Sequence, residues 1–293
     1  MAAEGKVNRM FKRKWSVLLF LLPGLSLLVV FCVVPFITGI RYSLMGGAKM
    51  SNFIGLANYQ SLWKNKIFLL GLKNTLVLCG ICAPLLWGIA FAFSLILQSI
   101  QPRGSLFRRI AFMPYIMPSS AMVLIWLMVF DYGGLLNQLL QALGINRVLW
   151  LESSALRFPV IVMFLWENLG FCMVLFLSAL QTVPQSLYEY ATLEGAGFFT
   201  KALKISLPEI LPTAFFIFVI AWMKAFQIFK EVYVIAGAYP DTSAYTLQHY
   251  MNNMFTRLDY PMVTAAAYSF AAIVFALFAV LFLLQRRAMQ SVQ

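Results

Sequence analysis

The chain has 293 residues, of which 62% are hydrophobic and only 11% are charged. Soluble globular domains carry about 25% charged residues, so a chain this poor in charge cannot cover a water-exposed surface. The net charge of +12 comes from short basic clusters between long apolar runs, as the positive-inside bias of membrane proteins produces. Composition therefore predicts a membrane protein and argues against a soluble domain and against nucleic-acid binding.

Runs of about 20 apolar residues predict membrane-spanning helices. There are six of these runs: 17–40, 75–97, 110–130, 158–180, 211–229 and 262–284. The first follows Lys12, Arg13 and Lys14, but it is too long for a signal peptide and no small-residue cleavage site follows it. We expect an all-α polytopic membrane protein with six transmembrane helices and a single domain over residues 1–293.

The basic residues between the runs predict the orientation. They are enriched in the N-terminal tail and in the connections on the same side of the membrane, whereas the opposite connections hold fewer. The connection 41–73 is an exception, because it carries five basic residues (Arg41, Lys49, Lys64, Lys66 and Lys73). Since the positive side is normally cytoplasmic, we expect both termini in the cytoplasm.

Side chains suited to metal binding are sparse. Cys79 and Cys82 have the spacing of a zinc or redox pair, but no second pair or histidine cluster accompanies them. We interpret them as small packing residues of a helix, and His249 as a polar loop residue. We expect no metal site. The phosphate-binding pattern G-x-x-x-x-G-K-[ST] is also absent, so any energy from ATP must come from a partner.

The inner connection 184–212 has the pattern of a docking element. Ser186 and Glu189 have the spacing of a capping box at a helix start, and Gly195 and Gly197 allow a sharp turn with positive φ. A second amphipathic stretch, 198–207, leads to Pro208. A helix, a glycine turn and a helix, too short for a domain, suit contact with a partner.

This connection resembles the EAA loop of the permease subunits of ABC importers, roughly E-A-A-x-x-D-G-A followed by I-x-L-P. The matching residues are Glu189, Ala191, Gly195, Ala196, Ile205, Leu207 and Pro208. The chain departs from the pattern at Tyr190, where the family has Ala, and at Glu194, where it has Asp. The segments Phe53-Ile-Gly-Leu-Ala-Asn-Tyr and Lys73-Asn-Thr-Leu are similar to the maltose and glycerol-3-phosphate-type permeases of the carbohydrate-uptake branch.

The resemblance implies a type I ABC importer permease fold in the bacterial inner membrane and the import of a carbohydrate. It also implies a second permease subunit, two subunits that bind ATP and Mg, and an extracytoplasmic solute-binding protein. This chain would then be no enzyme and hold no cofactor. The residues implied to couple it to the ATPase are Glu189, Ala191, Glu194, Gly195, Ala196 and Gly197.

Polar residues inside the apolar runs are candidates for the solute path, because a charge at membrane depth costs at least about 2.5–3.5 kcal/mol on insertion scales. In the resembling family, polar and aromatic side chains of these same spans hold the solute. The candidates are Trp166, Glu167, Asn168, Trp222, Lys224, Phe226 and Gln227.

Two interpretations of these residues remain open. Glu167 and Lys224 can neutralise each other as a structural ion pair, while Asn168 and Gln227 link neighbouring helices by hydrogen bonds. Alternatively, Lys224 meets an acidic group on the solute. Glu231 is interpreted as a solvated loop charge.

A second functional class is an ion-coupled secondary transporter. Such proteins favour inverted repeats and carboxylates at mid-membrane depth, whereas here only Glu167 is so placed and no repeat is evident. A membrane enzyme is disfavoured because no cluster of catalytic groups recurs at one membrane face.

Overall fold

A computed structural model describes residues 20–46, 52–100 and 105–290. Most of these residues are helical, and one two-stranded antiparallel sheet lies among them. The chain forms two compact units. The first comprises the described residues up to Lys64 together with Met254–Ala271, and the second comprises Asn65–Asn253 together with the residues after Ala271.

Six helices among the described residues are long and apolar enough to cross a membrane, as predicted. They are Phe20–Ser43, Lys66–Ser99, Ala121–Ala142, Ser154–Leu180, Leu211–Ala236 and Tyr260–Arg287. Residues 17–19 of the first predicted run, the basic tail before it, Lys49 and Arg103 lie outside the described residues. The second helix extends well beyond the predicted 75–97, because polar residues at both of its ends are helical too.

The third predicted run, 110–130, is not one helix, so that prediction was wrong in detail. It divides into α5 (Ser105–Ile116) and α6 (Ser119–Phe130). Pro118 stands between them in an extended conformation, with φ −60° and ψ 131°. Proline has no N–H to donate to a preceding carbonyl and its ring clashes with a continuing helix, which explains the break.

In the first unit, polar side chains close the turn after the first span. The strands β1 (Met45–Gly46) and β2 (Asn52–Phe53) pair there, before α3 (Ala57–Lys64). Asn58, from the Phe53-to-Tyr59 segment singled out in the sequence, donates its amide hydrogens to the carbonyls of Ser43 and Met45. Its role here is to satisfy backbone groups in the turn.

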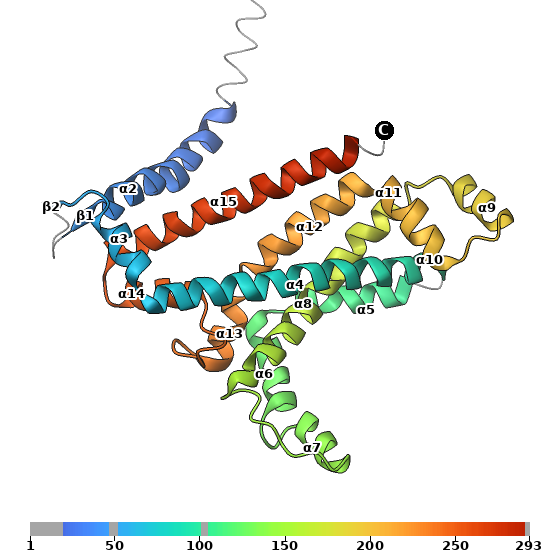
Figure 1. Ribbon diagram of the computed structural model, residues 1–293, viewed down its shortest axis with the longest axis horizontal. Helices are drawn as coiled ribbons and strands as arrows, with labels where there is room; N and C mark the ends of the chain where they lie inside the picture. The colour runs from blue at the N-terminus through green and yellow to red at the C-terminus, as the bar shows by residue number, and fades with distance from the viewer. Residues whose placement is uncertain (1–19, 47–51, 101–104, 291–293) are drawn as a thin grey trace, which may run out of the picture. The chain divides into compact units, whose positions relative to one another are not determined.

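The second unit is built around α4 (Lys66–Ser99) and α8 (Arg157–Leu180), which cross each other (Figure 1). Its core lies between α4, α8 and α12 (Leu211–Ala225), where Leu86, Phe176 and Ile217 are buried. The other elements that begin in this unit are α7 (Leu135–Ala142), η2 (Ser154–Leu156), α9 (Gln185–Leu193), α10 (Phe198–Lys201), η3 (Ala202–Ser206), α11 (Leu207–Glu209), α13 (Phe229–Ala236) and α14 (Leu247–Thr256). The chain then continues into α15 (Tyr260–Gln290).

The segment after α13 is fastened to α4 by the Lys73-Asn-Thr-Leu sequence. Asn74 donates to the carbonyls of Thr242 and Tyr245 and accepts from the Arg157 guanidinium. The Thr75 hydroxyl accepts from the backbone N–H of Leu247 at 2.9 Å. These two side chains therefore anchor a segment about 170 residues away in sequence.

His249 is not a loop residue, as the sequence had suggested. It lies in α14, fully buried, with its Nδ1 2.8 Å from the hydroxyl of Thr246. Burial lowers the pKa of its imidazole to about 4, so the ring is neutral at physiological pH. It packs as a ring against Phe229 and Tyr245.

Close packing of α5 on α8 depends on Gly170. A Cβ atom at this position would lie 1.9 Å from the carbonyl oxygen of Ala111, which is backbone and cannot move aside. Gly170→Leu should therefore separate the two helices and destabilise the protein by about 3 kcal/mol, the upper range for overpacking. Thermal unfolding of the purified protein in detergent measures this loss.

Gly80→Leu is the matched control, because Gly80 lies in the interior of α4 with open space around its Cβ position. The control should unfold at the wild-type temperature or higher, since leucine favours helix more than glycine does. Equal melting temperatures for the two variants would contradict the close approach at Gly170.

Candidate functional site

The connection between α9 and α10 is a tightly closed helix end. Gly195 has φ +77°, and two hydrogen bonds close the turn: Ala196 N–H donates to the Ala191 carbonyl, and Gly195 N–H donates to the Thr192 carbonyl. This is the Schellman arrangement of a helix C-terminus. The predicted positive φ at Gly195 is confirmed.

Two local predictions for this connection were wrong. Helix α9 begins at Gln185 after Pro184 without a side-chain cap, so Ser186 and Glu189 form no capping box. Gly197 has φ −73° and starts α10 in an extended conformation that any residue can adopt. The sharp turn therefore rests on Gly195 alone, while Glu194 is the residue at the end of α9.

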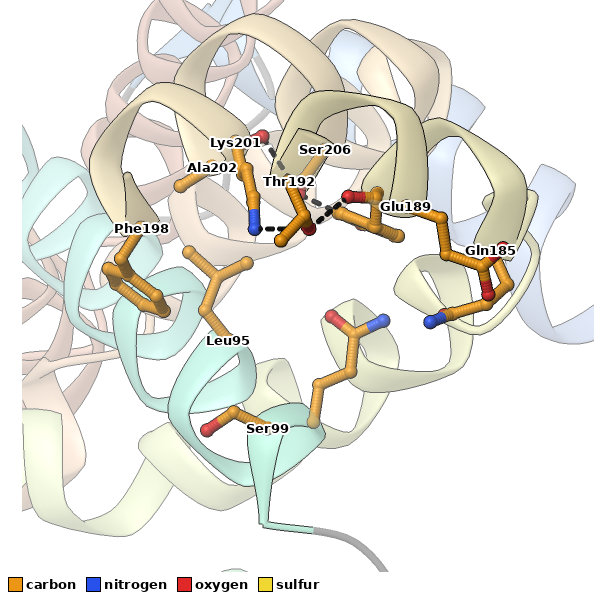
Figure 2. Close-up of a pocket in the computed structure, with 11 residues that line it drawn as sticks. Leu95, Ser99, Gln185, Glu189, Thr192, Phe198, Lys201, Ala202 and Ser206 are labelled. Atoms are coloured by element: carbon orange, nitrogen blue, oxygen red, sulfur yellow. Dashed lines mark hydrogen bonds between the residues drawn. The ribbon is translucent and has the colours of Figure 1, made fainter. Parts of the chain in front are cut away.

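Polar contacts hold α9 against α10 and η3. The Tyr188 hydroxyl lies 2.9 Å from that of Ser206, and the Lys201 ammonium donates to the Thr192 hydroxyl at 2.9 Å. Figure 2 shows Thr192, Lys201 and Ser206 beside a cavity of about 490 Å³ between the connection and the end of α4, and Tyr188 also lines this cavity. Glu189 lines this cavity (Figure 2), so the connection is a folded element rather than an open loop.

Large apolar side chains of this element point into solvent. Leu193 is 85% exposed, Phe199 77% and Tyr190 69%, whereas Ala191 is buried. None of these residues lies in a membrane-spanning helix. Exposed large apolar side chains outside the membrane-spanning helices are typical of an interaction surface. Sequence reasoning missed Leu193 and Phe199, although their apolar character beside the glycine turn was a usable signal.

Inside the membrane-spanning region, Glu167 does not pair with Lys224. Its carboxylate lies 2.5 Å from the ammonium of Lys230, which is also 3.4 Å from the carboxylate of Glu231. Glu231 is 2% exposed, so its interpretation as a solvated loop charge was wrong. Helix α13 continues the fifth span, so Lys230 and Glu231 belong to that span rather than to a loop. Lys230 thereby reaches Glu167 on α8. The group therefore holds two carboxylates and one ammonium.

Lys224 has different surroundings. Its ammonium lies 4.7 Å from the centre of the Tyr115 ring and 5.6 Å from that of Phe171, and it donates to the Tyr115 hydroxyl at 3.2 Å. The two rings are stacked, with centroids 4.6 Å apart. Contacts of a cation with aromatic faces are worth about 0.5–2 kcal/mol. They offset only part of the cost of placing a charge at membrane depth.

The other predicted path residues do not join one site. Trp166 packs edge-on against Trp126, and Asn168 bonds to the Phe164 carbonyl of its own helix. Trp222 and Phe226 pack against each other. They lie on a different side of α12 from Lys224, because positions two apart on a helix point in nearly opposite directions. Gln227 is exposed just after α12.

A small enclosed space adjoins the Glu167–Lys230–Glu231 group. It is about 10 Å³ and is lined by Trp126, Met163, Glu167 and Glu231 among others, which is room for one water molecule. Within the described part of the chain, Glu231 Oε2 and Trp126 Nε1 are buried without a hydrogen-bond partner. Both atoms belong to residues that line this space.

Metal binding finds no support in these groups. Among the residues that the structure describes, no cluster of three or more His, Cys, Asp or Glu side chains could hold an ion. Cys79 and Cys82 are buried in α4 as free thiols.

Lys230 is expected to contribute to stability. Lys230→Met leaves the buried side chains of Glu167 and Glu231 without this cation. Because the Lys230 side chain is 43% exposed and water screens part of the interaction, the loss should cost about 1–3 kcal/mol. The triple variant Lys230→Met/Glu167→Gln/Glu231→Gln removes the ammonium together with both acidic groups and should recover most of this loss. Thermal unfolding of the purified protein in detergent compares them.

Lys224→Met is the matched control, since it breaks no pair with a carboxylate within the described residues. It should lower the melting temperature much less than Lys230→Met. If Lys230→Met unfolds at the wild-type temperature, the ion group is not what holds α13 to α8.

Six apolar spans and a folded helical element outside them define a multi-pass membrane protein. The comparisons agree, because residues 85–292 match the family described as "binding-protein-dependent transport system inner membrane component". The chain belongs to this family. It is a multi-pass protein of the inner membrane, and the family is a membrane component of transport systems rather than an enzyme.

Individual relatives agree with this assignment. A diacetylchitobiose uptake system permease protein of Streptomyces coelicolor is 33% identical over 297 residues, covering 94% of this chain and 84% of the relative. An sn-glycerol-3-phosphate transport system permease protein of Yersinia enterocolitica is 29% identical, covering 80% and 82%. A trehalose/maltose transport system permease protein of Thermococcus litoralis is 27% identical, covering 84% and 85%.

A solved structure shares the fold. It is a chain of a bacterial ABC transporter involved in the import of the acidic polysaccharide alginate, with a TM-score of 0.85 at 22% identity, covering 96% of this chain and 99% of that chain. The predicted type I importer permease architecture is therefore confirmed.

Proposed function

We propose that this chain is one of two membrane-spanning subunits of an ABC importer that takes up a carbohydrate. Its partners are a second permease subunit, an extracytoplasmic solute-binding protein and two subunits that bind ATP and Mg and hydrolyse the ATP. The observation that carries the proposal is the folded α9–α10 element with its exposed apolar side chains. Family membership and the names of the relatives, which transport diacetylchitobiose, trehalose or maltose, support it.

The α9–α10 element is connected so that its displacement is transmitted to two membrane-spanning helices. It follows α8 through Pro184 and leads through η3 and α11 directly into α12. The Schellman turn and the contact between Tyr188 and Ser206 make it stiff. A partner that displaces it therefore moves α8 and α12 together. These helices carry Glu167 and Lys224, so movement outside the membrane reaches the polar groups within it.

An ion-coupled secondary transporter remains the alternative, and the geometry gives it little support. Such a mechanism needs a carboxylate free to exchange its counter-ion in mid-membrane. Here Glu167 is already neutralised at 2.5 Å by Lys230 of the same chain. Co-purification of ATP-binding subunits distinguishes the two classes.

Gly195→Val tests the coupling role of α9–α10. The Cβ has open space around it, so the only penalty is the positive φ, which side chains branched at Cβ resist. A strain of about 1.4 kcal/mol corresponds to tenfold weaker docking. We expect about tenfold weaker association with the ATP-binding subunit and a parallel fall in ATP hydrolysis stimulated by the binding protein. Titration of the purified complex in detergent measures both.

Gly197→Val is the matched control, because Gly197 also has open space but an ordinary φ of −73°. It should bind as the wild type does. Leu193→Ser is a second arm. The Leu193 side chain is almost fully exposed, so its replacement should change the binding of a partner but not the stability of this chain. If Gly195→Val and Leu193→Ser both retain full association, the element does not dock an ATPase.

We further propose that both termini and the α9–α10 element face the cytoplasm, as the basic residues of the connections suggest. In a background with Cys32→Ser, which removes the exposed native thiol, a cysteine at Thr200 should react with a membrane-impermeant maleimide only in inverted vesicles. A cysteine at Tyr239, an exposed residue after α13, should react only in intact cells. The opposite labelling would invert the orientation and remove the coupling argument.

A further inference from the structure

We infer that Lys224, Tyr115 and Phe171 form a binding site for the negatively charged group of an acidic saccharide, and that this site selects the solute. The inference rests on the proposed import function and deepens it. We call the three residues the cation–ring site. Its members come from α12, α5 and α8, and all three are half-buried.

The first argument is charge. Two lysines lie six residues apart on either side of the junction of α12 and α13. Lys230 is neutralised by the carboxylates of Glu167 and Glu231. Lys224 has no carboxylate within 4.0 Å among the residues that the structure describes, and its polar contact is the neutral hydroxyl of Tyr115. The positive charge of Lys224 is therefore available to an anion.

The second argument is the shape of the surroundings. The stacked rings of Tyr115 and Phe171 lie beside the ammonium and remain partly accessible. Aromatic faces pack against the C–H groups of sugar rings, while a phenol hydroxyl can exchange hydrogen bonds with sugar hydroxyls. A cation beside such rings fits a sugar that carries a carboxylate or a phosphate.

The third argument is the backbone. Helix α12 ends at Ala225 and α13 begins at Phe229, within one membrane-spanning segment. Interrupted helices at membrane depth occur where the backbone is buried in protein or lines a cavity, and transporters place solute sites at such breaks. Lys224 lies in the last turn before the break.

A purely structural role for Lys224 predicts a different effect of its loss on solute uptake. If the ammonium only packs on the two rings, its loss should slow the uptake of every solute to the same extent. If it binds the solute, its loss should affect charged solutes alone. The comparison of an acidic saccharide with its neutral ester separates the two roles.

The test uses the whole complex with its solute-binding protein in proteoliposomes. The probes are an oligogalacturonide, its neutral methyl ester, a phosphorylated sugar, and neutral disaccharides such as maltose, trehalose and diacetylchitobiose. ATP-dependent uptake of each probe is measured for the wild type, Lys224→Met and Lys224→Arg. Lys73→Met is the control, since Lys73 is an exposed lysine of α4.

We expect the wild type to take up an acidic probe, and Lys224→Met to lower that uptake about tenfold or more, as for loss of a charged hydrogen bond. Lys224→Arg should retain most of the uptake, and Lys73→Met all of it. Whether the carboxylate or the phosphate probe responds identifies the acidic group. Tyr115→Phe should raise the KM for the acidic probe while changing the maximal rate little.

Two outcomes overturn the inference while leaving the proposed function intact. In one, the wild type transports only neutral saccharides. In the other, Lys224→Met slows acidic and neutral probes equally. If the wild type shows no ATP-dependent uptake of any saccharide although its ATP-binding subunits are bound, the proposed carbohydrate function itself fails.

Discussion

The ion pair between Lys230 and Glu167 governs how charge is distributed in the second unit. A carboxylate buried without its counter-charge at membrane depth is costly, so α13 must hold its lysine against α8. With Glu231 drawn into the same group, the two acidic residues share one ammonium. Lys224 is consequently left without an acidic partner among the described residues. The position of one helix therefore decides which lysine is structural and which can meet a solute.

Close helix packing supports the same arrangement. Gly170 allows the backbone of α5 to approach α8, and this approach brings Tyr115 beside Phe171 and Lys224. At the other end of α8, Pro184 leads into α9, where the Schellman turn at Gly195 presents Leu193 and Phe199 to solvent. One helix thus connects the α9–α10 element to the three side chains of the proposed cation–ring site. Such a connection is what a subunit needs if ATP is hydrolysed elsewhere in a complex.

The exposed apolar side chains of the chain fall into two groups that need different explanations. Apolar side chains along the spans face lipid, as the composition requires. Apolar side chains on α9 and α10 cannot be explained in this way, because they lie outside the spans. A soluble partner surface is the simplest cover for them, and this is why the element, rather than the spans, carries the proposed link to an ATPase.

The sequence by itself determined the class, the number of spans and the glycine turn, because hydropathy over 20 residues and the need for positive φ at Gly195 are local properties. It misjudged the third span, since an apolar run does not reveal that Pro118 divides it. It left open whether Glu167 pairs with Lys224, placed Glu231 in solvent and missed Tyr115 and Phe171. Pairing depends on which helix faces meet, and only the tertiary structure sets the rotation of α12 and α13 against α8. That rotation placed Lys230 on Glu167 and left Lys224 beside two aromatic rings.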